Sequence, residues 1–252
     1  MQQYFIDTTL TLQQVETITD PRIVHHVVKV MRMRPEAQFE LVDATHQPYL
    51  AVLQAVAADQ KQLQVQITKR LQRQTELPVS VTLACGLPKR EKTEWIVQKA
   101  TEMGASKIVF FGGERSVVRW DTNKAAKKLA RLQLIAQEAG EQSHRNVWPT
   151  VTFVSNITAV TALSASVKLF AYEESGKQGE NRVLKTALNQ LNAEDELLCV
   201  FGPEGGISEN ETAILRTHDF QATGLGPRIL RTETAPLYFL SCVSYAAELI
   251  YS

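Results

Sequence analysis

One loop-forming segment constrains this chain more than any other, the run GLGPRILRTETA from Gly224 to Ala235. It joins an apolar-alternating run at 220–225 to a long apolar helix predicted over 236–251. Two glycines and a proline predict a tight, preset turn, and apolar Ile229 and Leu230 stand where a loop is normally polar. Apolar contacts beside exposed backbone amides suit a flat ligand with polar edges, such as adenine. A triphosphate fits poorly, because no lysine follows the glycines as a phosphate-binding loop requires.

A second glycine loop, GPEGGIS at 202–208, has the same setting. It follows a strand predicted at 197–201 and precedes a helix predicted at 209–217, whose start Ser208 and Glu211 mark as a capping box. In open α/β sheets, ligands bind at the carboxyl ends of the strands, where both loops are expected to lie. Either loop alone is also compatible with an ordinary strand-to-helix turn. The two together predict one shared pocket.

The first 72 residues are predicted to form a small β-barrel. Short apolar-alternating runs, separated by turn-forming residues, occur at 38–42, 49–56 and 62–67. One helix is predicted over 21–31, with Asp20 as its N-cap and Pro21 in its first turn. A polar segment at 69–78, which ends in proline, is the predicted linker to a second domain.

Beyond this linker the pattern changes to alternating strands and helices. Strands are predicted at 79–85, 107–111, 167–171, 197–201 and 220–225. Helices are predicted at 89–103, 122–142, 181–191, 209–217 and 236–251. Gly104 is expected at the C′ position of the first of these helices. The alternation predicts an α/β fold, a largely parallel sheet with helices on both faces.

The two glycine loops resemble the signature loops of the RsmE-type methyltransferases, which belong to the SPOUT superfamily. The resemblance rests on GPEGGIS at 202–208 and LGPRILRTETA at 225–235, and the second match is too long to arise readily by chance. It implies methylation of N3 of a uridine in 16S ribosomal RNA of the small subunit, with S-adenosylmethionine as cofactor. It also implies a C-terminal trefoil knot in residues 73–252, which forms the cofactor pocket, and a PUA-like, RNA-binding barrel over residues 1–72.

The resemblance extends to individual site residues. Cofactor contacts are implied for Tyr172, Glu173, Phe201, Gly202, Glu204, Gly205, Gly206, Leu225, Gly226, Ile229, Leu230, Arg231, Thr232, Thr234 and Ala235. RNA contacts are implied for His25, Lys29, Arg32, Arg34 and Gln142. A basic, exposed helix end is the alternative interpretation of the cluster at 25–34.

Candidates for the reaction itself are Arg231, Arg115, Glu138 and Arg145. Methyl transfer from a sulfonium to uracil N3 requires in-line alignment and loss of the imide proton. Arginines beside the uracil oxygens would stabilise the resulting anion, and a carboxylate such as Glu138 or Glu233 would take the proton. Glu138, Gln142 and Arg145 are spaced i, i+4 and i+7, which predicts a shared helix face. Ordinary surface ion pairs are the alternative for each of these side chains.

The composition favours a globular protein rather than a uniformly basic one. The formal net charge is 0, although residues 77–131 hold eleven Lys and Arg against five Asp and Glu, which is compatible with a phosphate-facing surface. Cys85, Cys199 and Cys242 lie in apolar runs without C-x-x-C spacing, which predicts buried free thiols in a reducing compartment. We find no metal-ligand spacing, no membrane-spanning run and no signal peptide, so a cytoplasmic protein without a metal is expected.

A homodimer is expected, because the predicted helix at 236–251 is apolar around most of its circumference and must be buried on more than one side. The resemblance implies a twofold interface there. Two other functions remain open. The chain could be a catalytically silent RNA-binding factor of ribosome assembly, although such a protein has no need of intact glycine loops. It could also be a SPOUT methyltransferase that acts on transfer RNA.

Overall fold

The computed structural model describes residues 1–89, 91–174 and 182–250 and divides into two compact units. The smaller unit consists of Met1–Thr75 together with Gly140–Val147, and the larger unit of Glu76–Ala139 and Trp148–Ser252. Segment 140–147 therefore belongs to the smaller unit, whereas the sequence pattern assigned it to the second domain. Each unit has a hydrophobic core of its own.

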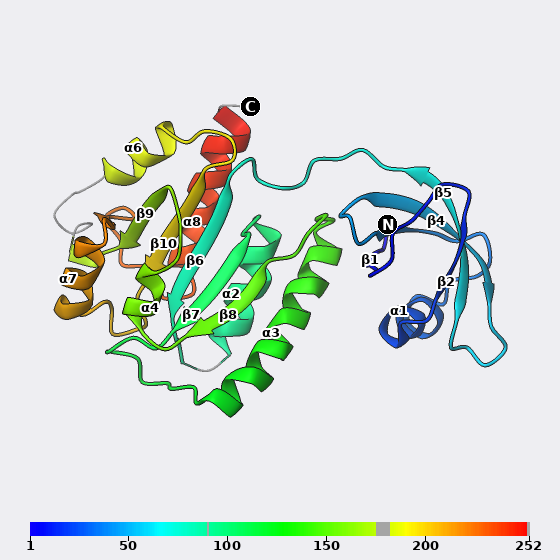
Figure 1. Ribbon diagram of the computed structural model, residues 1–252, viewed down its shortest axis with the longest axis horizontal. Helices are drawn as coiled ribbons and strands as arrows, with labels where there is room; N and C mark the ends of the chain where they lie inside the picture. Colours follow the sequence, from blue (N-terminus) through cyan, green and yellow to red (C-terminus); the bar gives the residue numbers. More distant parts are fainter. Residues whose placement is uncertain (90, 175–181, 251–252) are drawn as a thin grey trace. The chain divides into compact units, whose positions relative to one another are not determined.

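The smaller unit contains a five-stranded sheet in the order β1-β3-β4-β5-β2 (Figure 1). Its strands are β1 Gln3–Phe5, β2 Val15–Ile18, β3 Gln38–Val42, β4 Pro48–Val56 and β5 Leu63–Arg70. The three predicted strands are confirmed as β3, β4 and β5, and β1 and β2 lie at the edges of the sheet. β1 and β2 were not predicted, because three or four residues are too few to display a period of two.

The helix predicted over 21–31 is confirmed as α1, Pro21–His25, which continues as the π-helix η1, His26–Val30. The Asp20 carboxylate caps it by accepting a hydrogen bond from the backbone N of Arg22 at 2.7 Å. Ile23 and Val27 are fully buried in the same core as the strands. This short helical segment therefore covers one face of the sheet.

The larger unit contains a six-stranded, wholly parallel sheet in the order β11-β9-β10-β6-β7-β8. The strands are β6 Ser80–Gly86, β7 Lys107–Phe111, β8 Thr150–Val154, β9 Val167–Ala171, β10 Glu196–Phe201 and β11 Gln221–Thr223. The helices are α2 Lys92–Glu102, α3 Thr122–Gln142, α4 Ile157–Thr161, α6 Val183–Asn189, α7 Glu209–Thr217, α8 Ala235–Ser244 and η2 Tyr245–Ile250. The predicted α/β fold with a parallel sheet is confirmed.

Helices cover both faces of this sheet, as predicted (Figure 1). On one face, Leu83 and Cys85 belong to a core that includes α2, α3, α6 and α8. On the other face, Ala84 belongs to a core that includes α4 and α7. Successive side chains of a strand point to opposite faces, so a strand buried on both sides is apolar at nearly every position. The continuous apolar runs of the sequence are explained in this way.

Two elements of the larger unit were not predicted, β8 and α4. Both have only five residues, and β8 lies at an edge of the sheet with a single buried side chain, Val151. Their apolar pattern is therefore too weak to stand out. α2 begins at Lys92, later than the predicted start at 89. The predicted helix start at 181 and helix end at 251 lie outside the described residues.

α3 ends at Gln142 in a hydrogen-bonded cap. The backbone N of Arg145 donates to Gly140 O at 2.9 Å, while His144 adopts a φ of 58°, the left-handed conformation that glycine favours at this point. Arg145 therefore lies beyond the helix and is buried, so the prediction that it shares a helix face with Glu138 and Gln142 is wrong. A spacing of i+7 places two residues on one face only within a continuous helix.

Segment 140–147 is hydrogen-bonded to the N-terminal strands and helix of the smaller unit. Arg22 donates from both terminal nitrogens to the Glu141 carboxylate, at 2.7 and 2.9 Å. Gln3 Nε2 donates to Arg145 O at 2.7 Å in the buried interior. These charge-assisted and buried bonds bind the segment to residues that lie far away in the sequence.

Among the described residues, no helix is long and apolar enough to cross a bilayer. The same residues bring together no three His, Cys, Asp or Glu side chains that could share a metal ion. All three cysteines are free, as predicted, although Cys242 is only half-buried whereas Cys85 and Cys199 are buried. Burial raises the pKa of Cys85 to about 12, so this side chain stays a neutral thiol.

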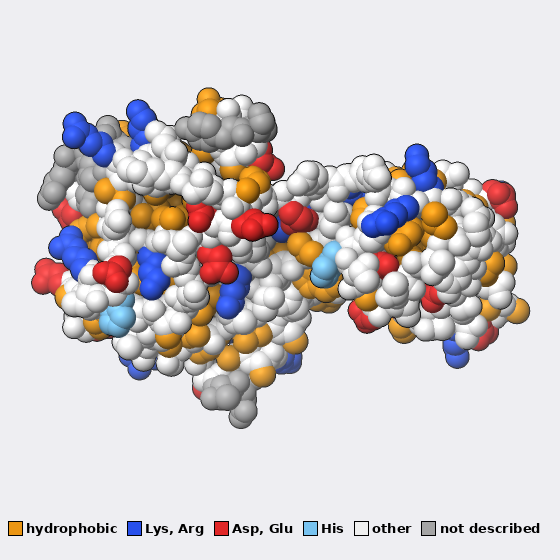
Figure 2. Space-filling model, turned by 45° about the horizontal axis from the view of Figure 1, so that its top comes forward, with side chains coloured by type: hydrophobic (Ala, Val, Ile, Leu, Met, Phe, Trp, Pro, Cys, Tyr) orange, Lys and Arg blue, Asp and Glu red, His pale blue; other side chains and the backbone are white. Residues whose placement is uncertain are grey.

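Charged side chains of both signs are interspersed over the face of the protein that Figure 2 shows. This mixture agrees with the formal net charge of 0. A polyanion would therefore meet local clusters of cations on that face rather than one continuous basic surface.

Gly104 follows α2 with a φ of 91°, as expected for a glycine at C′, and a Cβ there would lie 2.7 Å from Leu77 Cγ. We expect Gly104→Ala to lower the free energy of unfolding by about 2 kcal/mol, because left-handed strain alone costs roughly 1–2 kcal/mol and the contact adds to it. Urea denaturation measures the change. Gln98→Ala, at an exposed position of α2, is the control and should change stability by less than about 0.5 kcal/mol. Equal losses in the two variants would contradict this expectation.

Candidate functional site

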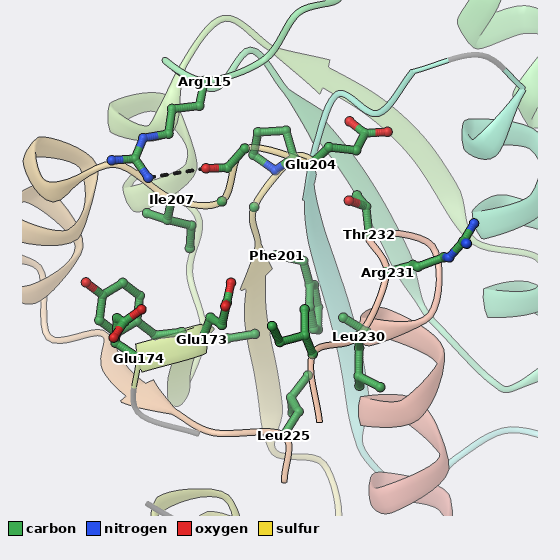
Figure 3. Close-up of a pocket in the computed structure, with 18 of the residues that line it drawn as sticks. Arg115, Glu173, Glu174, Phe201, Glu204, Ile207, Leu225, Leu230, Arg231 and Thr232 are labelled. Carbon is green, nitrogen blue, oxygen red and sulfur yellow. Dashed lines mark hydrogen bonds between the residues drawn. The ribbon is translucent and has the colours of Figure 1, made fainter. Parts of the chain in front are cut away.

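The two glycine loops follow β10 and β11 and meet at a cavity of about 710 Å³ in the larger unit (Figure 3). β9 lies between β10 and β11 in the sheet, so the carboxyl ends of three parallel strands share one edge. Most of the lining residues come from 171–174 at the end of β9, from 201–207 and from 225–232. The sequence prediction that both loops line one pocket is thus met.

One part of the cavity wall is apolar. Phe201, Leu225 and Leu230 lie together on it (Figure 3), and Ile207 adds a further apolar side chain. Phe201 is held in place because its buried ring packs edge to face on Phe239 of α8, with 5.7 Å between the ring centroids. Such a wall beside exposed backbone amides suits a flat, polar-edged ring.

Close backbone contacts and positive φ angles explain the glycines. A Cβ on Gly202 would lie 2.8 Å from the backbone of Gly206, because the loop folds back on itself. Gly226 has a φ of 88°, a conformation that other residues adopt only under strain. Gly205 approaches a neighbouring loop instead, since its Cβ would lie 2.8 Å from Arg115 Cβ. A side chain at 205 would displace the loop that carries Arg115.

Hydrogen bonds tie the Arg115 loop to the first glycine loop. Arg115 Nη1 donates to Gly205 O at 3.2 Å, and Ser208 Oγ donates to the Glu114 carboxylate at 2.5 Å. The bond from Ser208 is the largest cause of the lowered pKa of Glu114. Ser208 is also the N-cap of α7 and forms the predicted capping box with Glu211. The start of α7 therefore holds the loop that carries Arg115 beside the cavity.

Lys92 joins the two glycine loops and was not predicted as a site residue. Its Nζ lies 3.1 Å from Glu204 Oε1 and 3.0 Å from Glu233 Oε2, so one cation pairs with a carboxylate from each loop. The hydrogen bond with Glu233 is the largest cause of the raised pKa of Lys92. One local signal existed, because Lys92 occupies the first turn of α2, where the helix dipole disfavours a cation. We call this arrangement the Lys92 bridge.

Most side chains predicted to contact the cofactor line the cavity. These are Tyr172, Glu173, Phe201, Gly202, Glu204, Gly205, Gly206, Leu225, Gly226, Ile229, Leu230, Arg231, Thr232 and Ala235. Thr234 is not among them, and it is exposed at the residue before α8. The lining residues that sequence reasoning missed are Lys92, Ala171, Glu174, Pro203, Ile207, Glu209, Pro227 and Arg228. Apart from Lys92, they lie in or beside the segments already singled out.

Two of the candidate catalytic side chains, Arg115 and Arg231, line the cavity. The guanidinium of Arg231 points away from Phe201 (Figure 3), and it makes no hydrogen bond or ion pair with any residue that the structure describes. Glu138 is exposed on α3 and does not line the cavity. Arg145 is buried in the smaller unit. The catalytic roles of all four side chains stay predictions.

The residues of the predicted RNA-binding cluster are all exposed on the smaller unit: His25, Lys29, Arg32 and Arg34. The neighbouring His26 turns inward, with its Nδ1 2.7 Å from Tyr4 Oη, so the two histidines point in different directions. Lys29 donates to Gln60 Oε1 in the turn between β4 and β5. The cluster therefore lies beside this turn.

Sequence comparisons extend over both units. The RNA methyltransferase domain family matches residues 75–244, and the RNA methyltransferase PUA domain family matches residues 18–67. The chain is 43% identical to the ribosomal RNA small subunit methyltransferase E of Bacillus subtilis, over 99% of this chain and 98% of that protein. It is 30% identical to the protein of the same name from Synechocystis, over 98% of this chain and 76% of that protein.

Solved structures agree. A methyltransferase from Legionella pneumophila, in complex with the bound cofactor SAM, superimposes with a TM-score of 0.83 at 28% identity, over 97% of each chain. A ribosomal RNA small subunit methyltransferase E from Neisseria gonorrhoeae, bound to S-adenosyl methionine, gives a TM-score of 0.81 at 28% identity, again over 97% of each chain. The chain thus contains an RNA methyltransferase domain and a PUA domain. The chain belongs to the ribosomal RNA small subunit methyltransferase E family, and the resemblance of its loops to RsmE-type enzymes is confirmed.

Removal of the Lys92 bridge should loosen both glycine loops. We expect Lys92→Met to speed amide hydrogen exchange in 202–206 and in 225–235, because both loops lose the cation that their carboxylates share. Lys92→Arg should retain most of the protection. Lys99→Met is the matched control, since Lys99 lies on the same helix but pairs within it, with Glu102 at 2.8 Å. Faster exchange in only one loop would show that the bridge does not join them.

The Lys92 bridge should also depend on pH. Burial alone would raise the pKa of Glu204 and Glu233, but hydrogen bonds and the Lys92 charge hold both values below the usual one. Carboxyl groups with a lowered folded-state pKa stabilise the fold above their unfolded pKa, about 4.3, and lose this contribution as pH falls through the folded value. Exchange protection factors of the two loops should therefore stay constant from neutral pH to about 4.5 and fall below it. Lys92→Met should show a smaller fall, and an equal one would exclude the bridge as its cause.

Proposed function

We propose that this chain transfers a methyl group from S-adenosylmethionine to N3 of a uridine in 16S ribosomal RNA of the small subunit. The observation that carries the proposal is the single cavity lined by both glycine loops. Relatives of the same fold supply the cofactor and the class of RNA, since they were solved with S-adenosylmethionine and are named for the small subunit. The uridine and its N3 follow from the resemblance of the loops alone.

The residues of the cavity fit S-adenosylmethionine. The adenine would lie against Phe201, Leu225 and Leu230, with backbone amides of the glycine loops at its polar edges. The sulfonium and ammonium groups are cationic, and carboxylates such as those of Glu173 and Glu209 line the same cavity. Apolar contact for the base and negative charge for the methionine end are therefore both supplied by this chain.

The bound cofactor supplies an electrophilic methyl group. Loss of the N3 proton leaves negative charge on the uracil oxygens, and we assign its stabilisation to Arg115 and Arg231 at the cavity. Glu233 is a weak proton acceptor, because despite its burial a backbone hydrogen bond, the hydrogen bond from Lys92 and the charge of Lys92 keep its pKa low. Glu138 therefore remains the proposed acceptor and Arg145 the proposed third cation. Neither side chain lines the cavity, so these two roles are supported by the resemblance of the sequence alone.

RNA contact is proposed for the exposed cluster His25, Lys29, Arg32 and Arg34 and for exposed Gln142 at the end of α3. Lysine and arginine contacts to phosphate give salt-dependent affinity that does not depend on sequence. A single-stranded target base is read separately, by its edges, at the cofactor cavity. We expect residues 1–72 to contribute RNA affinity and residues 73–252 to carry out the reaction. Because a ribosomal substrate is cytoplasmic, the protein is also proposed to act in the cytoplasm.

A homodimer is proposed from the last helical elements of the chain. Phe239 and Val243 of α8 are fully buried. Large apolar side chains nevertheless remain exposed on α8 and η2: Tyr238, Tyr245, Leu249 and Ile250. An apolar surface of this kind marks an association site, and a twofold dimer is the commonest way to cover it. The trefoil knot implied by the resemblance remains the expected path of the chain in this region.

The proposed function is tested by mapping methylated nucleotides in 16S ribosomal RNA from cells with and without the protein. A methyl group on N3 occupies the pairing edge of uracil and stops reverse transcription. One stop should vanish in the deletion strain and return when the wild-type chain is supplied. A stop that vanishes from transfer RNA instead would favour the transfer RNA alternative, and failure to bind S-adenosylmethionine in calorimetry would favour the silent assembly factor.

Arg115→Ala and Arg231→Ala should each lower kcat by about 10²–10³-fold, the effect of removing one group that stabilises a developing anion. Transfer of labelled methyl to small ribosomal subunits measures the rate, and calorimetry measures cofactor affinity beside it. Arg216→Ala, at an exposed position in the last turn of α7, is the control and should keep the wild-type rate. Wild-type kcat in both cavity variants would remove these arginines from the reaction.

Leu249→Glu combined with Ile250→Glu should give a monomer, because it puts charge into the proposed apolar interface. Sedimentation equilibrium should give about twice 28.2 kDa for the wild type and 28.2 kDa for the double variant. Leu134→Glu, at an exposed apolar position on α3, is the control and should leave the mass unchanged. A wild-type mass of 28.2 kDa at micromolar concentration would refute the dimer.

A further inference from the structure

A second cavity lies within the smaller unit. It has a volume of about 590 Å³ and is formed by the turn 46–48, by residues 70–74 at the end of β5 and by Asn146. Its volume is within the range of cavities that hold small ligands. The cofactor proposal makes no use of it.

Hydrogen bonds fix the frame of this cavity. Gln47 Nε2 donates to Leu71 O at 2.7 Å and so ties the turn to the end of β5. The Asp43 carboxylate accepts bonds from Thr45 Oγ1 at 2.7 Å and from the backbone N of Gln47 at 3.1 Å. Burial alone would raise the pKa of Asp43, but these bonds hold it below its usual value, so the turn is built on an ionised carboxylate at neutral pH. The cavity is thus formed before any ligand binds.

Arg73 belongs to the wall of the cavity rather than to its binding groups. Its guanidinium pairs with the Glu40 carboxylate and donates to Gln3 Oε1. His144 Nδ1 lies 3.0 Å from the same Glu40 carboxylate, and Asn146 Nδ2 donates to Arg73 O at 3.3 Å. The negative charge of Glu40 is therefore already matched by its neighbours.

Four lining side chains remain to face a ligand: His46, Arg70, Gln72 and Gln74. All four are exposed, and none of them makes a side-chain hydrogen bond or ion pair with any residue that the structure describes. The described lining contains no Asp or Glu. The cavity thus offers a guanidinium together with amides that donate and accept hydrogen bonds.

We propose that this cavity binds one nucleotide of single-stranded RNA, with Arg70 on a phosphate and Gln72 and Gln74 on the edges of the base. The inference rests on the proposed function, because it takes RNA as the substrate. A guanidinium fork matches phosphate oxygens, and base edges present the donors and acceptors that amide side chains pair with. A cationic ligand would meet Arg70 without a lining carboxylate, and a lone phosphate would leave the amides unused.

This cavity and the basic cluster lie at opposite ends of one strand. Lys29 of the cluster bonds to Gln60, just before β5 begins at Leu63, whereas Arg70 ends the same strand. At about 3.3 Å per residue the two ends are roughly 25 Å apart. The smaller unit would therefore hold an RNA strand at two separate points.

Arg70→Ala and Lys69→Ala form a matched pair for the test. They are adjacent, both exposed, and each substitution removes one positive charge, but successive side chains of a strand point to opposite faces and only Arg70 lines the cavity. Binding of a fluorescein-labelled single-stranded RNA oligonucleotide to the full chain is measured by anisotropy at several salt concentrations. We expect Arg70→Ala to weaken binding severalfold and to reduce the slope of log affinity against log salt by about 0.7, the value for one phosphate of a single strand. Lys69→Ala should leave both unchanged.

The double variant Gln72→Ala and Gln74→Ala changes no charge. It should weaken RNA binding and leave the slope of log affinity against log salt unchanged. Equal affinity and slope for Arg70→Ala and Lys69→Ala would overturn the inference. So would efficient displacement of the RNA by inorganic phosphate together with wild-type binding by the glutamine variant, since the cavity would then be an anion site only. Cofactor calorimetry on the same proteins separates the two proposals. If the wild-type protein binds RNA through Arg70 but does not bind S-adenosylmethionine, the proposed function is contradicted. The inference about the second cavity is then still supported.

Discussion

The parallel pairing of β9 with both β10 and β11 is the constraint on which the candidate site depends. Parallel strands all end at the same edge of a sheet, so segments 171–174, 202–207 and 225–232 must emerge side by side although they are distant in sequence. The pairing continues past the end of β9, where the backbone N of Tyr172 donates to Thr223 O at 3.0 Å. Backbone hydrogen bonds thus create the cavity, and the side chains decide only what it holds.

The glycine loops owe their arrangement to residues outside them. Lys92, from the first turn of α2, pairs with a carboxylate of each loop, and Glu114 accepts a hydrogen bond from Ser208 at the end of the first one. Glycine allows the close approaches but gives no rigidity of its own, since it is the residue with most backbone freedom to lose. Charged side chains on neighbouring elements therefore hold the glycine loops in their conformation.

Sequence alone revealed those parts of the protein whose signals are local. The capping box of Ser208 and Glu211, the C′ glycine Gly104 and both glycine loops are each encoded within a few residues, and each was found. The sequence pattern wrongly placed Arg145 on the same helix face as Glu138. α3 ends before Arg145, at a left-handed His144, and no glycine at this position indicates the helix end in the sequence. Lys92 and the cavity beside Arg70 depend on contacts between distant segments, which no periodicity records.

Segment 140–147 affects how the chain can be made. Within the smaller unit, Gln3 bonds to Arg145 and Arg22 to Glu141, across 142 and 119 positions of sequence. Synthesis releases the chain from its N-terminus, so residues 1–75 emerge well before these partners exist. Contacts over such separations close slowly, because the loop between them must first be ordered. The smaller unit contains the first residues to be synthesised, but it can complete its fold only after segment 140–147 has been made.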